Sequence, residues 1–280
     1  MRVLVTGSSG QLGSTIVAML RDRHEAIGLD LAPAPTTRHV GAIEDRALLE
    51  RVFHLHAPID AVIHTASLHA PHVGRVSRDR FEEVNVAATR RLLDLAADHG
   101  AHRFVYTSTT SIYGHALVPT DRAIWVTEEL APRPRDVYDE TKLAAEVACA
   151  EFAADDRLST ISLRTGRFFA EDPALVAAYR LYRGLDVRDA ATAHHLALEH
   201  PDQPTGVYNV AARAPFTPDD TSELLSDAPA MIRRRVPWAE AAFTARGWSL
   251  PNTIDRVYVI AKAEAELGYQ PSWDIARLTT

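Results

Sequence analysis

Short apolar runs alternate with longer amphipathic segments along the first 165 residues of the chain. Such runs, rich in β-branched residues, are typical of strands in a parallel sheet that is covered on both faces. We expect strands at Arg2–Thr6, Glu25–Leu29, Ala61–His64, Phe104–Thr107 and Thr160–Leu163. The segments between them repeat apolar residues every three or four positions, as Phe81–Ala97 does, which indicates helices. Because alternating strands and helices are joined by right-handed crossovers, the pattern predicts an α/β fold with a doubly wound parallel sheet.

The pattern changes after Gly166, where prolines become frequent and the predicted helices become shorter. We expect helices at about Thr192–Glu199 and Ala261–Leu267, and a strand at Gly206–Val210 that could return to the edge of the main sheet. The change predicts two domains, a sheet domain at residues 1–165 and a small irregular lobe at residues 166–280.

The composition excludes several classes of protein. The 280 residues include 30 Lys+Arg and 37 Asp+Glu, a net charge of −7 with no block of one sign, so neither nucleic acid nor an anionic membrane is expected as a partner. The single cysteine, Cys149, excludes a disulfide framework and is typical of a reducing compartment. No stretch approaches the ~20 apolar residues of a membrane span, and the first residues lack the apolar core of a signal peptide. We therefore expect a cytoplasmic globular protein.

Three glycines at three-residue intervals follow the first predicted strand. Gly7 and Gly10 lie between that strand and a predicted helix at Leu12–Leu20, and Gly13 lies in the first turn of that helix. In such a unit the first glycine permits a tight turn, the second lets the backbone approach a pyrophosphate, and the third lets the helix pack on the strand, while the helix amino terminus adds N–H donors. The motif predicts a dinucleotide site, although a glycine-rich turn without a ligand would have the same spacing. No lysine follows Gly13, which excludes a loop for nucleoside triphosphates.

Asp30 ends the second predicted strand, seventeen residues beyond Gly13. A carboxylate at this point can accept hydrogen bonds from both hydroxyls of an adenosine ribose, and it repels a 2′-phosphate. Asp30 therefore predicts NAD rather than NADP as the cofactor. The alternative is a loop or helix-cap carboxylate without a ligand.

Lysine is rare in this chain, because only Lys142 and Lys262 among the 30 basic residues are lysines. Lys142 lies four residues after Tyr138 in a predicted helix at Val137–Ala154, which puts the two side chains on one face. Since a neighbouring ammonium stabilises a phenolate, we expect it to lower the pKa of Tyr138. The pair then predicts a general base that removes a hydroxyl proton while a hydride leaves the same carbon. A surface contact between the two side chains is the alternative.

The order of these motifs resembles that of the extended short-chain dehydrogenases/reductases, the NAD-dependent sugar epimerases and dehydratases. The resemblance is carried by Val5–Gly13 with its three glycines, Asp30, Ile63–Ala66, Asn85, Thr107–Gly114, Tyr138-x-x-x-Lys142 and Lys262–Pro271. It covers most of the chain, and the residues after Gly166 match less well. The resemblance implies a Rossmann-type NAD-binding domain at residues 1–165 and a substrate-binding lobe at residues 166–280.

The resemblance also implies roles for individual residues. The implied catalytic residues are Tyr138, Lys142 and Thr109, whose hydroxyl would hydrogen-bond the reacting oxygen. Neighbouring hydroxyls could take the place of Thr109, namely those of Ser108, Thr110 and Ser111. The implied cofactor contacts are Gly7, Gly10, Gln11, Leu12, Gly13, Asp30, Ile43, Ala66, Asn85, Thr107, Tyr138 and Lys142, and the implied substrate contacts are Ser67, Thr109, Thr110 and Arg167. Asn85, a polar residue among apolar helix positions, equally suits an internal hydrogen-bonding role.

Two features depart from the family's pattern. The interval between Leu163–Arg167 and Asp186–Asp189 is about twenty residues, shorter than in the nucleotide-sugar epimerases that the chain resembles, which favours a small free substrate. Arg167 replaces a frequent asparagine, and it could either clamp a substrate carboxylate or phosphate or form a surface ion pair. His69 and His72 lack a nearby carboxylate or cysteine, so no metal site is expected.

Together these residues predict an NAD-dependent oxidoreductase that acts on a hydroxyl of a sugar or sugar-like small molecule, with Tyr138 as the base. Two alternatives stay open: a nucleotide-sugar 4-epimerase that reduces NAD transiently, and a non-catalytic NAD-binding sensor. The sequence does not distinguish dehydrogenation from epimerisation or dehydration. From the family resemblance we expect a homodimer formed through Phe81–Ala97 and Val137–Ala154.

Overall fold

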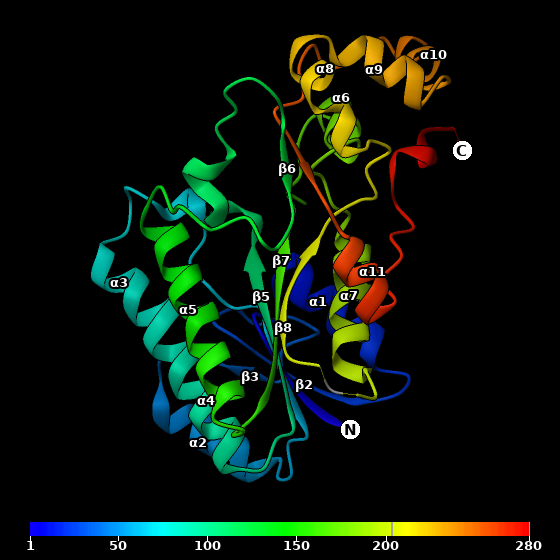
Figure 1. Ribbon diagram of the computed structural model, residues 1–280. Helices are drawn as coiled ribbons and strands as arrows, with labels where there is room; N and C mark the ends of the chain where they lie inside the picture. The colour runs from blue at the N-terminus through cyan, green and yellow to red at the C-terminus, as the bar shows by residue number, and fades with distance from the viewer. Residues whose placement is uncertain (203, 280) are drawn as a thin grey trace. The chain divides into compact units, whose positions relative to one another are not determined.

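The main sheet of the computed structural model, which describes residues 1–202 and 204–279, has the strand order β3-β2-β1-β4-β5-β7-β8 (Figure 1). Its strands are β1 Arg2–Thr6, β2 Glu25–Asp30, β3 His39–Val40, β4 Ala61–His64, β5 Arg103–Thr109, β7 Ser159–Thr165 and β8 Gly206–Val210. The pairings from β3 through β5 are all parallel. The chain order reverses at β1, since β2 and β3 extend to one side of it and β4 and β5 to the other. The carboxyl ends of strands at such a switch point form the usual ligand crevice of an open α/β sheet.

The helices connect these strands as the sequence predicts. They are α1 Gln11–Leu20, α2 Arg46–Leu55, α3 Arg78–Glu82, α4 Ala88–Asp98, α5 Val137–Ala154, α6 Pro173–Arg180, α7 Val187–Glu199, α8 Thr221–Ser226, α9 Ala228–Arg235, α10 Ala239–Thr244 and α11 Ala261–Leu267. Segments of 3₁₀ helix are η1 Ala70–His72, η3 Thr110–Leu117, η4 Pro218–Asp220 and η5 Ile275–Thr279, and η3 is kinked at Gly114. Segment η2 Glu83–Ala87 is a π turn. The predicted α/β class is confirmed.

Helices lie on both faces of the main sheet, which explains why its central strands β1 and β4 are largely apolar. Buried residues of α2, α4 and α5, such as Leu49, Leu92 and Ala145, form a core with Leu4 and Phe104 of the sheet. On the opposite face, α1 and α7 cover the sheet (Figure 1). Strand β4 is consequently buried along its whole length.

Two predicted helices differ from the structure at their limits. The stretch predicted at Phe81–Ala97 is helical but contains the π turn η2 between α3 and α4, and Asn85 lies in that turn. π turns widen the backbone locally and occur often near functional sites. The helix predicted to begin at Thr192 begins five residues earlier, at Val187, where the Asp186 carboxylate accepts a hydrogen bond from the Arg188 nitrogen at 3.0 Å.

The described chain divides into two compact units. The first contains Met1–Ile112, Pro134–Arg164 and Ala191–Tyr208, and the second contains Tyr113–Arg133, Thr165–Ala190 and the described residues from Asn209 onward. The second unit has its own core, which includes Phe216, Leu224, Ile232, Phe243 and Val257, and a parallel pair of strands, β6 Ile124–Val126 and β9 Arg256–Tyr258. The chain passes between the units after Ile112, Arg133, Arg164, Ala190 and Tyr208. The division into two domains at residues 1–165 and 166–280 remains a proposal.

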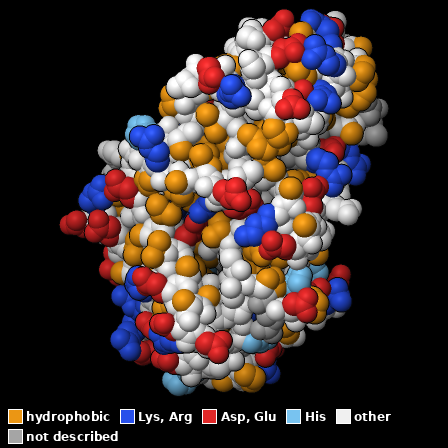
Figure 2. Space-filling model, viewed as in Figure 1, with side chains coloured by type: hydrophobic (Ala, Val, Ile, Leu, Met, Phe, Trp, Pro, Cys, Tyr) orange, Lys and Arg blue, Asp and Glu red, His pale blue; other side chains and the backbone are white. Residues whose placement is uncertain are grey.

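Charged side chains of both signs are interspersed on the face drawn in Figure 2. Many are paired across short distances, for example Arg46 with Glu50 and Arg233 with Glu240. None of the described helices combines the length and apolar character needed to cross a membrane.

Candidate active site

The turn between β1 and α1 requires glycine at its first and third motif positions. Gly7 has a φ of +73°, and a Cβ there would lie 2.5 Å from Thr65 Oγ1 and 2.8 Å from the Ala66 nitrogen. A Cβ at Gly13 would lie only 2.1 Å from the carbonyl oxygen of Gly7. The turn therefore packs against the end of β4 on one side and against the first turn of α1 on the other.

Helix α1 begins with a residue that has no side chain to cap it. Gly10 is the N-cap, in extended conformation, and its carbonyl accepts a hydrogen bond from the Ser14 nitrogen at 2.9 Å. The first N–H groups of a helix have no carbonyl partner within the helix. Here these groups belong to Gln11, Leu12 and Gly13 and can hold an anionic group, assisted by the positive end of the helix dipole.

Asp30 lies at the carboxyl end of β2 and braces this turn. One oxygen of its carboxylate accepts a hydrogen bond from the Ser9 nitrogen at 2.9 Å, and the other accepts one from the Ala32 nitrogen at 3.0 Å. Each carboxylate oxygen has a second lone pair. The geometry is therefore compatible with ribose hydroxyls as further donors, although Asp30 also has the loop-bracing role that the sequence left as an alternative.

His64, at the end of β4, is buried and neutral. Its Nδ1 lies 2.6 Å from Thr6 Oγ1 and its Nε2 lies 2.9 Å from Thr89 Oγ1. Because the Thr89 hydroxyl donates to the Asn85 carbonyl, it accepts from His64, which assigns the proton to Nε2. Burial, with a smaller contribution from the charge of Lys142, lowers the pKa of His64 to about 3.

Asn85 joins the segment that follows β4 to helix α5. Its Oδ1 accepts from the Leu68 nitrogen at 2.8 Å, and its Nδ2 donates to the Leu68 carbonyl and to Thr141 Oγ1, both at 3.1 Å. Both amide hydrogens are thus used within the protein, and the side chain is 1% exposed. This is the internal role that the sequence left open for Asn85, and it fixes the segment that contains Ala66 and Ser67.

Five hydroxyl-bearing residues, Thr107–Ser111, follow one another at the end of β5, and Thr109 among them hydrogen-bonds Tyr138. The Thr109 hydroxyl accepts a hydrogen bond from the Ser111 nitrogen at 3.1 Å and shares a hydrogen bond with the Tyr138 phenol, which helps to lower the pKa of Tyr138. The other hydroxyls have different surroundings: Ser108 donates to the Glu146 carboxylate, Ser111 accepts from Arg135 Nη2 at 2.9 Å, and Thr110 is 4% exposed. The geometry therefore favours Thr109 for the role that the sequence could not assign to one hydroxyl.

Lys142 lies one helical turn after Tyr138 on α5, and both side chains are more than nine-tenths buried. The Lys142 Nζ donates to the Thr107 carbonyl at 2.6 Å and lies 4.3 Å from the centroid of the Tyr106 ring. Burial lowers the pKa of Lys142 to about 7, and burial raises the pKa of Tyr138 to about 12. The expected net lowering of the Tyr138 pKa is therefore wrong for this structure, because the net shift is upward, although an ammonium on Lys142 would oppose it. Desolvation of the phenolate outweighs the hydrogen bond from Thr109, and the lysine amine is bound to the Thr107 carbonyl.

Three residues around this pair were missed by the sequence analysis. Glu146, one turn beyond Lys142 on α5, forms a buried ion pair with Arg164 at 2.8 Å, and its negative charge raises the pKa of Lys142 against the effect of burial. Tyr138, Lys142 and Glu146 follow one another at four-residue steps and so share one face of α5, a pattern that could have predicted the position of Glu146. His194 of α7, whose Nε2 lies 2.7 Å from Thr107 Oγ1, had no comparable signal in the sequence.

The remaining predicted site residues have varied surroundings. Ile43 is 6% exposed and belongs to the core beneath the sheet. Ser67 Oγ lies 3.4 Å from Nδ1 of His69, whose ring centroid lies 6.4 Å from that of Tyr138. Arg167 belongs to the second unit, where it forms an ion pair with Glu171, and its side chain is 48% exposed. The sequence left two roles open for Arg167, a clamp for a substrate carboxylate or phosphate and a surface ion pair, and the structure has the ion pair.

The donor set at the carboxyl ends of β1 and β2 suits a dinucleotide. The glycine turn leaves the start of α1 without a capping side chain, and Asp30 adds a carboxylate at the neighbouring strand. The turn closes tightly only because Gly7 and Gly13 have no Cβ, and the open start of α1 follows it. This arrangement is typical of sites that hold a pyrophosphate. The fold and this turn define the class of Rossmann-type α/β proteins.

Within that class, the chain belongs to the NAD dependent epimerase/dehydratase family, an enzyme family whose model matches residues 3–178. A curated 3-beta-hydroxysteroid dehydrogenase from Mycolicibacterium neoaurum is 33% identical over 173 residues, which are 58% of this chain and 46% of that protein. A UDP-glucose 4-epimerase from Halalkalibacterium halodurans is 34% identical over 156 residues, or 52% of this chain and 44% of the relative. The chain thus matches somewhat less than half the length of these relatives.

Solved structures share the fold over nearly the whole chain. A short-chain dehydrogenase/reductase superfamily protein from Agrobacterium tumefaciens with bound NAD has a TM-score of 0.75 at 23% identity, covering 99% of this chain and 94% of that one. UDP-glucose 4-epimerase from Thermotoga maritima with UDP-glucose has a TM-score of 0.71 at 22% identity, covering 97% and 94%. At these identities the likeness shows the fold alone.

Proposed function

We propose that this protein is an NAD-dependent oxidoreductase that acts on a hydroxyl of a sugar or sugar-like small molecule. The observation that carries the proposal is the hydrogen bond between Thr109 and Tyr138, with Lys142 one helical turn away. A Rossmann-type fold supports many activities, so these side chains and the family, rather than the fold, support this one.

The chain's own residues would hold the cofactor at the carboxyl ends of β1, β2 and β4. The backbone at Gly10 and the start of α1 would bind the pyrophosphate, and Asp30 would bind the adenosine ribose, which favours NAD over NADP. Thr107, Ala66 and the other cofactor contacts implied by the family resemblance remain part of this proposal. When bound, the nicotinamide supplies the hydride acceptor.

Tyr138 would take the proton from the substrate hydroxyl at its phenol oxygen, and Thr109 would orient that hydroxyl. With a pKa of about 12, the neutral phenol is a poor base at physiological pH. Two groups of this chain favour the phenolate: the Thr109 hydroxyl, by hydrogen bonding, and the ammonium form of Lys142. Because the pKa of Lys142 is about 7, a substantial fraction of that ammonium is present at neutral pH.

The substrate contacts implied by the family resemblance, Ser67, Thr109 and Thr110 of the first unit and Arg167 of the second, remain proposals for each unit by itself. His69 lies close to the Tyr138 ring. A small free sugar or sugar acid is favoured over a nucleotide sugar because of the short interval before Asp186. The relatives' names, a 3-beta-hydroxysteroid dehydrogenase and UDP-glucose 4-epimerases, add sterols and nucleotide sugars to the compounds to be tested.

A substrate screen with NAD tests the proposal. Accumulation of reduced cofactor with a free sugar, a sugar acid or a sterol identifies a dehydrogenase, whereas product without net reduction identifies an epimerase or a dehydratase. We expect Tyr138→Phe to lower turnover by about 100-fold or more while the NAD dissociation constant changes little. Unchanged turnover would overturn the mechanism, and tight NAD binding without turnover of any compound would favour a sensor.

A cytoplasmic homodimer is proposed on the family resemblance, through α3, α4 and α5. Val147, which is 48% exposed on α5, is an apolar side chain that such an interface would cover. Sedimentation of the purified chain distinguishes the dimer from a monomer.

A further inference from the structure

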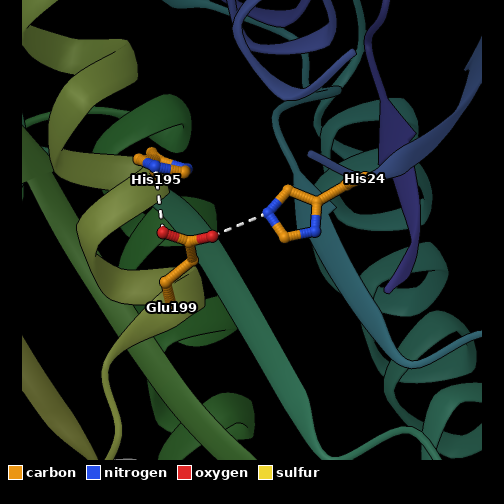
Figure 3. A group of neighbouring side chains, drawn as sticks. All are labelled: His24, His195 and Glu199. Carbon is orange, nitrogen blue, oxygen red and sulfur yellow. Dashed lines mark hydrogen bonds and ion pairs between the residues drawn. The ribbon is translucent and has the colours of Figure 1, made fainter. Parts of the chain in front are cut away.

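Two histidines and a glutamate that are far apart in sequence meet in the first unit, on the side of α7 that faces the loop between α1 and β2 (Figure 3). His24 Nε2 lies 2.8 Å from Glu199 Oε1, and His195 Nε2 lies 3.1 Å from Glu199 Oε2. One nitrogen or oxygen of each residue lies within 4.8 Å of the corresponding atoms of the other two. Figure 3 shows both rings directed toward the same carboxylate.

We propose that His24, His195 and Glu199 form a binding site for a divalent transition-metal ion, with Zn²⁺ as the ion that suits it best. Two imidazole nitrogens and one carboxylate are a ligand set that Zn²⁺ takes, with a fourth position for water, whereas Ca²⁺ and Mg²⁺ prefer oxygen ligands. Ligand atoms around a tetrahedral Zn²⁺ are about 3.3 Å apart, given Zn–N and Zn–O bonds of about 2.0–2.1 Å. The separations from the two histidine nitrogens to Glu199, 2.8 and 3.1 Å, are slightly shorter than that value, so small side-chain rotations would accommodate the ion.

The position of the cluster on α7 favours a cation. His195 and Glu199 are four residues apart and therefore lie on one face of the helix. Glu199 is the last residue of α7, where the exposed carbonyl groups carry partial negative charge. A carboxylate at this end of a helix is unfavourable by itself, and a bound cation compensates for both negative groups.

The cluster is largely buried, and only one nitrogen of each histidine ring has a partner within it. The side chain of His24 is 6% exposed and that of His195 is 19% exposed, so both rings are largely removed from water. The Nδ1 atoms of both rings are buried and have no hydrogen-bond partner among the described residues. Because Nε2 of each ring faces Glu199, an ion at the carboxylate would bind the Nε2 atoms, and Nδ1 would carry the proton of each neutral imidazole.

The Arg23 guanidinium would compete with a metal ion for Glu199, and a cavity beside His24 gives access to the cluster. Arg23 Nη1 lies 3.2 Å from Glu199 Oε2, but the Arg23 side chain is 67% exposed and can move away at small cost. An open cavity of about 700 Å³ is lined by Arg23, His24, Glu25 and Asp60, among others, and provides an entry path beside His24.

A metal here would tie α7 to the loop before β2 and would lie apart from the proposed catalytic residues. We therefore expect a stabilising ion rather than a catalytic one. Because metal ligands must lose their protons, binding is expected to weaken as the pH falls below the range in which imidazole is neutral.

Calorimetric titration of the untagged, chelator-treated full chain with Zn²⁺ at neutral pH tests the site. We expect about one ion per chain, and affinity at least tenfold weaker in His24→Asn and in Glu199→Gln. His54→Asn, which removes an exposed helix histidine outside the cluster, is the matched control and should bind as the original chain does. Binding no tighter than that of a variant lacking all three ligands, or an equal loss in His54→Asn, would overturn the proposal.

Two further measurements do not depend on the stability of the ligand variants. Arg23→Ala removes the competing guanidinium from an exposed position, so it should fold normally and bind Zn²⁺ more tightly; unchanged or weaker binding would contradict the assignment of Glu199 as a ligand. Co²⁺ bound to the original chain should give the intense visible absorption of a four- or five-coordinate site. The weak spectrum of the hydrated ion alone would exclude the site.

Discussion

Replacing Glu146 by glutamine is expected to be among the most damaging near-isosteric changes in the first unit. Arg164 Nη2 donates to Glu146 Oε2 at 2.8 Å, and Arg164 Nε lies 3.1 and 3.2 Å from the two carboxylate oxygens. The two side chains are only 7% and 4% exposed. Glu146→Gln keeps the shape but removes the negative charge that faces the buried guanidinium. We therefore expect it to lower the free energy of unfolding by about 3–5 kcal/mol.

A double-mutant cycle tests the physical reason for this loss. Glu146→Leu with Arg164→Met removes both charges, and its expected cost is about 1–3 kcal/mol, chiefly because the buried Ser108 hydroxyl loses its acceptor. The cycle compares the original chain, Glu146→Leu, Arg164→Met and the double variant. Urea unfolding of these four proteins, followed by circular dichroism, gives the coupling free energy between the two side chains, which we expect to exceed about 2 kcal/mol. A loss below about 1 kcal/mol in Glu146→Gln, or strictly additive losses in the cycle, would refute the reasoning.

Three other predictions follow from the buried groups and the glycine turn. The pKa of Lys142 falls from 10.5 to about 7 on folding, so the unfolded chain binds more protons between these values and stability should rise with pH there; Lys142→Met should flatten this rise in urea titrations from about pH 7 to 9.5. The pKa of His64 falls from 6.5 to about 3, so stability should decrease as the pH is lowered through this window, by up to about 1.4 kcal/mol per pH unit, and less in His64→Gln. Gly13→Ala should destabilise by about 3 kcal/mol or more because its Cβ would lie 2.1 Å from the Gly7 oxygen, whereas Gly10→Ala, at 3.3 Å from that oxygen, should cost less than about 1 kcal/mol in the same assay.

The central strands were predictable because they are covered on both faces and form short apolar runs, as β1 and β4 do. Short strands were missed because β3 has only two residues and β6 and β9 have three each, too few for a periodic signal. The limits of α5 were predicted because Asp136, which caps it, and the pattern after it are local features.

The contacts of the candidate site were less predictable than its residues, because they depend on burial and on partners remote in sequence. Spacing placed Tyr138 and Lys142 on one face of a helix, but it could not show that the Lys142 amine binds the Thr107 carbonyl. Spacing also could not choose among the hydroxyls at the end of β5, which are separated only by their partners in space. The argument against a metal considered His69 and His72, which are near each other in sequence, whereas His24 meets His195 only through the fold.

Burial favours the neutral form of three titratable groups, His64 of β4 and Tyr138 and Lys142 of α5. It moves the pKa of His64 to about 3 and that of Tyr138 to about 12, and it moves that of Lys142 to about 7, so the neutral forms are favoured throughout. Lys142 is the only one of these three whose charge changes near physiological pH. If Tyr138 is the base, its activation within this chain therefore depends on the charge of Lys142. A neutral residue of similar length at that position would leave the phenol without this source of stabilisation for its anion, even where the Thr109 hydrogen bond is intact.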